Sequence, residues 1–200
     1  MSAPQQTEQW FIDRLGKLTA SRMSDAMAGK ETAARRNYIA QLVAERLTGE
    51  RQESFTTSAM EWGTSHEPIA RAEYEFLTGI DVEQVGFIQH PELEMCGASV
   101  DGLVGDVGLI EIKAPNTATH IDYLLGQKPP AKYVPQMALQ LICTGRKWCD
   151  FASFDPRMPE KHRLFVVRYQ PTDLGKYDAA AALFLADVAD TMARLERAAA

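Results

Sequence analysis

Apolar residues recur along the chain in two patterns, a helical spacing of three to four residues and a strict alternation. The helical spacing predicts helices over about 5–14, 20–28, 31–48, 58–78, 117–126, 131–143 and 171–197. The alternation predicts strands over 81–90, 94–100, 107–113, 147–154 and 163–169. This order predicts an α/β (α+β) fold, in which a central mixed β-sheet is flanked by helices.

Local signals fix several ends of these helices. Gly49 and Gly79 follow the helices over 31–48 and 58–78, as C-terminal stops do. Ser58 and Glu61 have the spacing of a capping box. Pro68 predicts a kink or a new start inside the long helix. The apolar positions of this helix are expected to face the core; they are Trp62, Ile69, Ala70, Tyr74 and Leu77.

Length and composition favour one globular domain over residues 1–200, with 46% hydrophobic residues and no apolar run long enough to cross a membrane. The N-terminus is polar and lacks the core of a signal peptide, so we expect a cytoplasmic protein. Three cysteines without Cys-x-x-Cys spacing are expected to be reduced and structural, and they make a zinc site improbable; they are Cys96, Cys143 and Cys149.

Residues 99–113 combine strand and turn signals with three charged side chains, Asp101, Glu111 and Lys113. We expect two antiparallel strands joined by a glycine-rich turn, which would bring Asp101 next to Glu111. Side chains two apart in a strand share a face, so Glu111 and Lys113 would lie together while the isoleucines beside them point into a core.

Two neighbouring carboxylates repel each other unless a cation lies between them. Oxygen ligands of this kind suit Mg²⁺, with Mn²⁺ as a possible substitute. Lys113 would stand beside the metal, where it could orient or help deprotonate a water, or hold a phosphate oxygen; burial beside a cation would favour its neutral form. The alternative is a surface hairpin with a cross-face ion pair, because this short pattern also arises by chance.

Other stretches have weaker signals for chemistry. Arg14, with the hydroxyls of Thr19 and Ser21 at a helix N-terminus, could bind an anion or could be an ordinary capped helix. Gln136 and Gln140 share a helix face, where they either pair internally or line a site. A basic cluster near the start of the 31–48 helix is a solvated face or a phosphate contact; it comprises Lys30, Arg35 and Arg36.

The formal net charge of −6 argues against a general nucleic-acid coat. It does not exclude an enzyme whose basic groups gather in one cleft, since metal-binding carboxylates themselves add negative charge.

The sequence resembles the lambda-exonuclease (YqaJ-type) family of phage alkaline exonucleases, which has a PD-(D/E)xK restriction-endonuclease-like core. The resemblance runs from about Trp10 to Tyr169, although Val100 stands where this superfamily often has proline. Its pieces occur in family order; they are 14–16 with 18–21, Trp62-Gly63 followed by Glu67, Ser99-x-Asp101-Gly102, Glu111-x-Lys113, Gln136 with Gln140, and 154–158 (Phe-Asp-Pro-Arg-Met).

The resemblance implies a role for each of these positions. Asp101 and Glu111, with the backbone carbonyl of Ile112, would hold a catalytic Mg²⁺, and Glu67 would be an outer or second-metal carboxylate. Lys113 would activate or orient the attacking water. The remaining positions would place the water, bind a 5′-phosphate or part the terminal base pair; they are Gln136 for the water, Arg14, Thr19, Ser21 and Ser99 for the phosphate, and Met60 for the base pair.

The resemblance further implies a processive 5′-to-3′ exonuclease on double-stranded DNA, encoded by a phage or prophage and acting in the bacterial cytoplasm. Such enzymes form a homotrimeric ring and leave a 3′ single strand for a single-strand annealing protein in recombination. A structure-specific endonuclease with the same fold, or a DNA-end-binding scaffold with a vestigial metal site, are the alternatives.

Overall fold

The computed structural model describes residues 3–52 and 57–199. Its larger sheet has the strand order β2-β5-β6-β7-β8. β6 and β7 are parallel to each other, and the other neighbours are antiparallel. The strands of this sheet are β2 (Val82–Glu83), β5 (Gly102–Val104), β6 (Gly108–Lys113), β7 (Trp148–Phe154) and β8 (Leu164–Tyr169).

A smaller sheet has the order β1-β4-β3, with β1 parallel and β3 antiparallel to β4. Its strands are β1 (Leu18–Thr19), β3 (Phe87–Gln89) and β4 (Cys96–Ser99). The strand expected over 81–90 is therefore two strands, β2 and β3, that belong to different sheets. The chain changes sheet again at Asp101, between β4 and β5.

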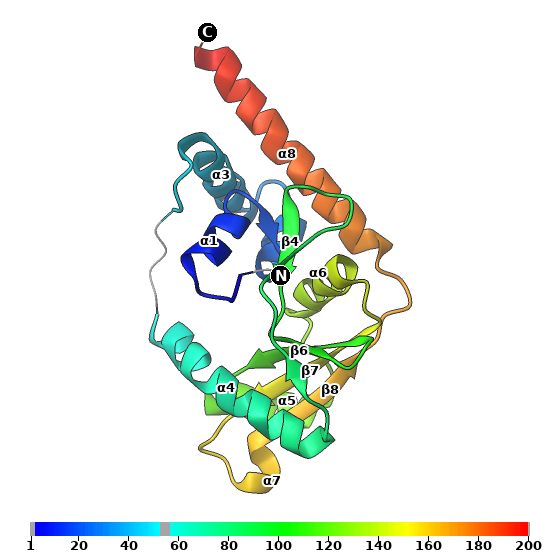
Figure 1. Cartoon of the computed structure of the whole chain (residues 1–200). Coiled ribbons are helices and arrows are strands. Elements are labelled where there is room, and N and C mark those ends of the chain that lie inside the picture. The colour runs from blue at the N-terminus through cyan, green and yellow to red at the C-terminus, as the bar shows by residue number, and fades with distance from the viewer. Residues whose placement is uncertain (1–2, 53–56, 200) are drawn as a thin grey trace.

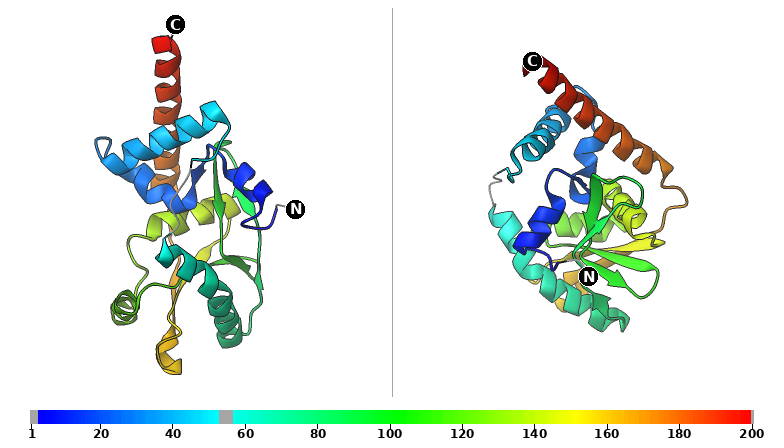
Figure 2. Two further views of the ribbon diagram at one scale, coloured as in Figure 1. Left: turned by 90° about the vertical axis from the view of Figure 1, so that its left-hand side faces the viewer. Right: turned by 45° about the horizontal axis from the view of Figure 1, so that its top comes forward.

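Helices cover both faces of the larger sheet (Figures 1 and 2). α4 (Ser58–Thr78) packs on one face, where Ala70 and Tyr74 belong to the same hydrophobic core as Ile110 and Ile112. α5 (Thr117–Gly126) and α6 (Val134–Thr144) cover the other face, and α6 also contacts the smaller sheet. A second core surrounds α6 and includes Leu139 and Phe151.

The remaining helices surround the smaller sheet or extend from the body. α2 and α3 pack against each other and against α8, whose C-terminal end projects away from the rest of the chain in Figure 1. The full set of remaining helices is α1 (Glu8–Arg14), the 3₁₀ turn η1 (Ala20–Arg22), α2 (Met23–Met27), α3 (Ala33–Thr48), α7 (Glu160–Arg163) and α8 (Gly175–Ala199). Within the described residues, no helix is long and apolar enough to cross a membrane.

The fold class predicted from the sequence, mixed α/β with helices around the strands, is confirmed. The predicted hairpin also exists, but its first strand is β5 rather than 94–100. Gly102 lies inside that strand rather than in the turn. A Cβ at this position would come 2.0 Å from the Val82 side chain, so the position requires glycine. The three cysteines are free and buried, as expected. Ile69 and Leu77, expected in the core, are 49% and 66% exposed instead.

Candidate active site and phosphate pocket

The larger sheet brings Asp101, Glu111 and Lys113 together. Gly102 pairs with Ile110 in the β5–β6 ladder, so Asp101 enters β5 opposite Glu111. Asp101 Oδ2 accepts a hydrogen bond from the Ile112 backbone N–H at 2.7 Å. Lys113 forms an ion pair with Glu111, which is fully buried. The shared face predicted for Glu111 and Lys113 is therefore present.

Two glutamines of α6 hold the Glu111 carboxylate from the other side. Gln136 Nε2 donates to Glu111 Oε1 at 2.6 Å, and Gln140 Nε2 donates to Glu111 Oε2 at 2.6 Å. The four-residue spacing places both amides on one face of the helix. A role at the site was expected only for Gln136, although the four-residue spacing also places Gln140 on the face of α6 that contacts Glu111.

The charges of this cluster affect one another. Burial raises the pKa of Asp101 well above its usual range, and the nearby Glu111 carboxylate raises that pKa further. Burial alone would lower the pKa of Lys113, but Glu111 and Asp101 outweigh it, so this pKa is raised. The two carboxylates therefore favour the charged form of Lys113. A neutral form of Lys113 beside a bound metal stays a prediction.

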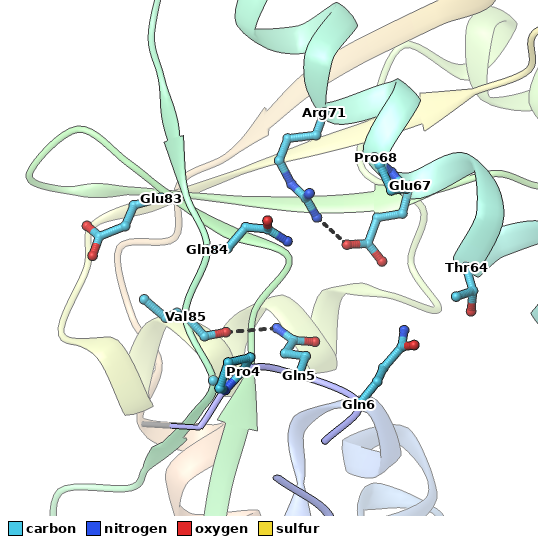
Figure 3. A pocket seen from close by; sticks show the side chains of 11 residues that line it. Pro4, Gln5, Gln6, Thr64, Glu67, Pro68, Arg71, Glu83, Gln84 and Val85 are labelled. Carbon is cyan, nitrogen blue, oxygen red and sulfur yellow. Dashed lines mark hydrogen bonds and ion pairs between the residues drawn. The ribbon is translucent and has the colours of Figure 1, made fainter. Parts of the chain in front are cut away.

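A cavity of about 300 Å³ opens beside this cluster, lined by Asp101, Lys113 and Tyr133. Glu67 of α4 lines the same cavity and also a neighbouring one of about 530 Å³. In Figure 3 the Glu67 carboxylate points toward Arg71, with which it forms an ion pair. Burial raises the pKa of Glu67 despite this partner. The structure therefore brings Glu67 to the cavity, but engages it with an arginine.

The donor set at this cavity fits a hard divalent cation. Asp101 and Ile112 line it, Glu111 lies beside them, and Mg²⁺ favours one or two carboxylates completed by waters and substrate oxygens. The repulsion that raises the pKa of Asp101 is what a cation would relieve. Among residues 3–52 and 57–199, no three or more His, Cys, Asp or Glu side chains form a group that could hold a metal ion. The fit therefore rests on two carboxylates and a backbone carbonyl.

A third cavity, of about 860 Å³, is lined by three of the four residues expected to bind a 5′-phosphate, Arg14, Thr19 and Ser21; Ser99 is not among its lining residues. Arg14 Nη1 donates to Ser99 Oγ at 2.7 Å, and Trp10 Nε1 donates to the same oxygen at 2.9 Å. The hydroxyls of Thr19 and Ser21 lie 3.4 Å apart. An arginine and three hydroxyls therefore gather at one end of the smaller sheet.

Basic side chains concentrate in this third cavity despite the acidic net charge. Each of three arginines lies 4.2 Å from the centre of an aromatic ring, a cation–π contact that favours this placement of the cations. The basic lining residues are Arg14, Lys17, Arg22 and Arg51. In the other basic cluster, Lys30 and Arg36 are exposed and Arg35 is not. Arg35 is buried and forms a 2.6 Å ion pair with Asp187, and Lys30 pairs with the same carboxylate at 3.3 Å.

Met60 lies in the first turn of α4 and lines the third cavity. Its side chain is 53% exposed. An apolar side chain at the rim of a basic cavity is not explained by core packing, and its role as a wedge between base pairs stays a prediction.

The segment between β4 and β5 connects the residues around Arg14 to the carboxylates. Ser99, which binds Arg14, precedes Asp101 by two residues. Gln140 bridges the same gap, since its Nε2 lies 3.4 Å from the Ser99 carbonyl oxygen and 2.6 Å from Glu111 Oε2.

A mixed sheet with Asp101, Glu111 and Lys113 at adjoining strands defines the PD-(D/E)xK nuclease fold. The chain belongs to the family described as "YqaJ-like viral recombinase domain", whose model matches residues 9–147. No curated protein matches significantly.

Two solved structures of one relative are similar over nearly the whole chain. They are described as an alkaline exonuclease, LHK-Exo, from Laribacter hongkongensis, one of them in complex with dAMP. Both are 46% identical to this chain and cover 96% of it and 98% of the relative, with TM-scores of 0.90 and 0.91. A phage-related exonuclease from Haemophilus somnus 129PT shares the fold, at 13% identity over 92% and 96% of the chains and a TM-score of 0.72.

Proposed function

We propose that this chain is a Mg²⁺-dependent exonuclease that degrades the 5′-phosphorylated strand of double-stranded DNA in the 5′-to-3′ direction. The observation that carries the proposal is the connection between the two parts of the site. Ser99, whose hydroxyl accepts a hydrogen bond from Arg14, lies two residues before Asp101. Gln140 contacts both the Ser99 carbonyl oxygen and Glu111. The similarity to an alkaline exonuclease supports it.

The phosphate pocket would set the direction of cutting. A terminal 5′-phosphate bears more negative charge than an internal phosphodiester, so Arg14 and the hydroxyls of Thr19, Ser21 and Ser99 favour an end over an internal position. An end held there places the next phosphodiester toward Asp101 and Glu111. Met60, at the rim, would contact the terminal base pair where the strands part.

The residues of the carboxylate cluster would divide the hydrolytic work. Asp101, Glu111 and the Ile112 carbonyl would hold Mg²⁺, which when bound neutralises charge on the scissile phosphate and lowers the pKa of a bound water. Gln136 and Gln140 fix the rotamer of Glu111. Lys113, as a cation, would donate to a non-bridging phosphate oxygen or orient the attacking water. Glu67 would complete the outer ligand set after leaving Arg71.

A homotrimeric ring would make the enzyme processive, because a closed ring retains DNA without tight binding. Support for self-association comes from α4, whose outer face exposes apolar side chains, with Phe76 90% and Leu77 66% exposed. Exposed apolar side chains that form a contiguous patch mark interaction sites, so this end of α4 is the proposed contact between copies. The 3′ single strand left behind would pass to a single-strand annealing protein in phage-type recombination.

Linear duplex DNA with one 5′ end phosphorylated and each strand separately labelled would test the proposal. We expect Mg²⁺-dependent loss of the phosphorylated strand from its end, while covalently closed circles stay intact. Cutting of circles would identify an endonuclease instead. No cutting in either Mg²⁺ or Mn²⁺ would identify a DNA-end-binding protein.

A further inference from the structure

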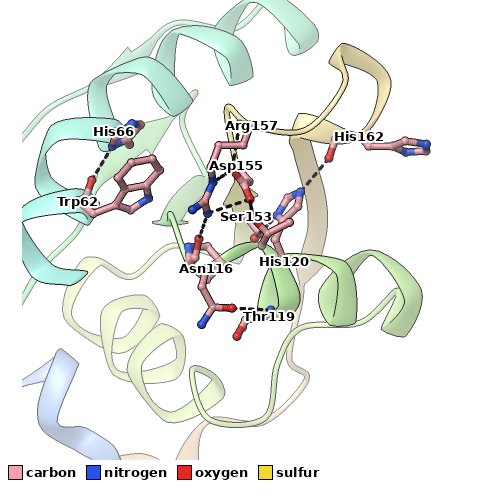
Figure 4. A network of polar contacts seen from close by, with 11 residues as sticks. Trp62, His66, Asn116, Thr119, His120, Ser153, Asp155, Arg157 and His162 are labelled. Carbon is pink, nitrogen blue, oxygen red and sulfur yellow. Dashed lines mark hydrogen bonds and ion pairs between the residues drawn. The ribbon is translucent and has the colours of Figure 1, made fainter. Parts of the chain in front are cut away.

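The segment 154–158 (Phe-Asp-Pro-Arg-Met) takes no part in the site described above, yet it forms a dense polar network at the end of β7 (Figure 4). Asp155 is fully buried. Its carboxylate accepts from Thr117 Oγ1 at 2.6 Å and from the Arg157 backbone N–H at 3.0 Å. It also accepts from Arg157 Nε at 2.7 Å and Nη2 at 3.0 Å, a bidentate ion pair.

This network fixes an exposed guanidinium. The Arg157 side chain is 49% exposed although its carboxylate partner is 0% exposed, so the cation faces solvent while the anion does not. The guanidinium lies 4.7 Å from the centre of the Trp62 ring on α4, and Nη2 lies 3.4 Å from the Pro115 carbonyl oxygen. Among the described residues, none accepts a hydrogen bond from Arg157 Nη1, which leaves two N–H donors.

Arg157 contacts or neighbours residues that line the 300 Å³ cavity beside Asp101 and Lys113. Lys113 pairs with Ser153 in the parallel β6–β7 ladder, so the segment after β7 emerges at the same sheet edge as Lys113. Pro115, which accepts from Arg157, lines that cavity. Gly63, next to Trp62 in the chain, lines it too. Ligands of sheets with parallel strands bind at this edge, beyond the carboxyl ends.

We propose that Arg157 binds a backbone phosphate of the DNA substrate beside the phosphodiester that is cut. This inference rests on the function proposed above. The free Nη1 donors and the locked orientation suit a phosphate oxygen, because a guanidinium that is already oriented loses little entropy on binding. Asp155 serves as the positioning residue for Arg157.

The chain contains a matched control at the other end of β7. Arg168 forms a bidentate pair with buried Asp150, at 2.8 and 2.9 Å, and lies 3.5 Å from the centre of the Trp148 ring. Its side chain is 48% exposed. Trp148 begins β7, whereas Asp155 directly follows its last residue. Arg168→Gln therefore removes the same charge and the same kind of ion pair far from the cavity.

The experiment compares Arg157→Gln, Arg168→Gln and the double variant Asp155→Asn/Arg157→Gln with the unmodified chain. Steady-state release of nucleotides from 5′-phosphorylated duplex gives kcat and KM. Fluorescence anisotropy with the same duplex in EDTA gives Kd at several NaCl concentrations, without cleavage. Thermal unfolding monitors the fold. The double variant leaves no buried carboxylate without a partner, so it separates loss of structure from loss of a phosphate contact.

For Arg157→Gln we expect Kd and KM to rise roughly tenfold with kcat nearly unchanged, the usual effect of losing one charged hydrogen bond. The dependence of log Kd on log salt should weaken by about 0.9, the value for one phosphate contact. Asp155→Asn/Arg157→Gln should regain thermal stability and keep the binding defect, and this variant decides the matter if Arg157→Gln does not fold. Arg168→Gln should bind DNA normally.

The proposal is wrong if Arg157→Gln matches Arg168→Gln in Kd and salt dependence, or if the double variant regains normal DNA affinity together with its stability. A chain that cuts no DNA would overturn the proposed nuclease function, but the anisotropy series in EDTA would still decide whether Arg157 binds phosphate. The cleavage assay therefore tests the proposed nuclease function, and the anisotropy series separately tests the role of Arg157.

Discussion

Gln140 Nε2 donates to Glu111 Oε2 at 2.6 Å in the interior of the molecule, where both side chains are fully buried. Glu111 is the only carboxylate among the described residues that Gln136, Gln140 and Lys113 all contact. A buried carboxylate needs several donors, so the first helical turns of α6 determine both the stability and the geometry of the site.

Replacement of Gln140 by Met keeps the length of the side chain and removes the donor. We expect the free energy of unfolding to fall by about 2 kcal/mol, because the buried Glu111 carboxylate loses a hydrogen-bond donor. Cleavage should also slow, because Glu111 loses its fixed rotamer. Gln136→Met, at a less buried position, should affect cleavage more than stability. Urea unfolding and the strand-labelled cleavage assay measure the two effects. If the two variants were equally stable, the greater burial of Gln140 would not account for its contribution to stability.

Lys113→Ala removes the cation of the cluster without touching the hydrophobic cores. We expect cleavage in Mg²⁺ to fall by about a hundredfold or more, as when one charge-stabilising donor is lost from a catalytic site, while the chain stays folded. EDTA should abolish cleavage by the unmodified chain, and Mg²⁺ should restore it. Undiminished cleavage by Lys113→Ala would refute the catalytic assignment.

Arg14→Gln tests the phosphate pocket. The variant should lose most of the preference for 5′-phosphorylated over 5′-hydroxyl ends, because the positive charge of Arg14 that attracts the terminal phosphate is gone. Initial rates on the two duplexes give this ratio. Arg36→Gln, at an exposed arginine that pairs only with Glu31 among the described residues, is the control and should leave the ratio unchanged. An equal loss of rate on both ends would remove the claim of a phosphate pocket.

Acid stability should depend on Asp155. Burial alone would raise its pKa, but hydrogen bonds from Arg157 and Thr117 outweigh burial and lower the pKa to about 2. A carboxylate with a lowered pKa contributes stability that is complete above its unfolded value near 3.8 and is lost as pH falls through about 2. The full contribution is about 2 kcal/mol. Asp155→Asn should make the free energy of unfolding less dependent on pH in this range. Urea unfolding between pH 2 and 6 measures that dependence. An unchanged slope of the free energy of unfolding against pH would show that Asp155 is not the group responsible.

Phe76→Ser should weaken the proposed ring. Phe76 is the most exposed large apolar side chain of α4, at 90%. Light scattering should show smaller particles, and the variant should start cleavage normally but release DNA after shorter runs. Leu183→Ser on α8, 67% exposed, is the control. If the unmodified chain is a monomer, or if the Phe76→Ser variant is still a trimer, this face of α4 does not form the contact between copies.

The sequence determined the local geometry of the site. A period of two places Glu111 and Lys113 on one face of a strand, and the glycine-containing turn folds Asp101 back opposite Glu111. Thr57, one residue before the expected Ser58, caps the start of α4 by accepting from the Met60 N–H. Gly49 and Gly79 end α3 and α4 in the left-handed region, as expected. These features depend only on neighbours in the chain, so a pattern of residues predicts them.

Tertiary packing decided the rest. The division of 81–90 between two sheets, the contact of Gln140 with Glu111 and the pairing of Glu67 with Arg71 depend on how sheets and helices meet. Asp155 and Arg157 belong to a turn that the sequence marks only as part of the family pattern, and the parallel pairing of β6 with β7 brings this turn next to residues that line the cavity. Residues distant in the chain meet through packing and burial, and burial turns an ordinary carboxylate such as Asp155 into a fixed anchor.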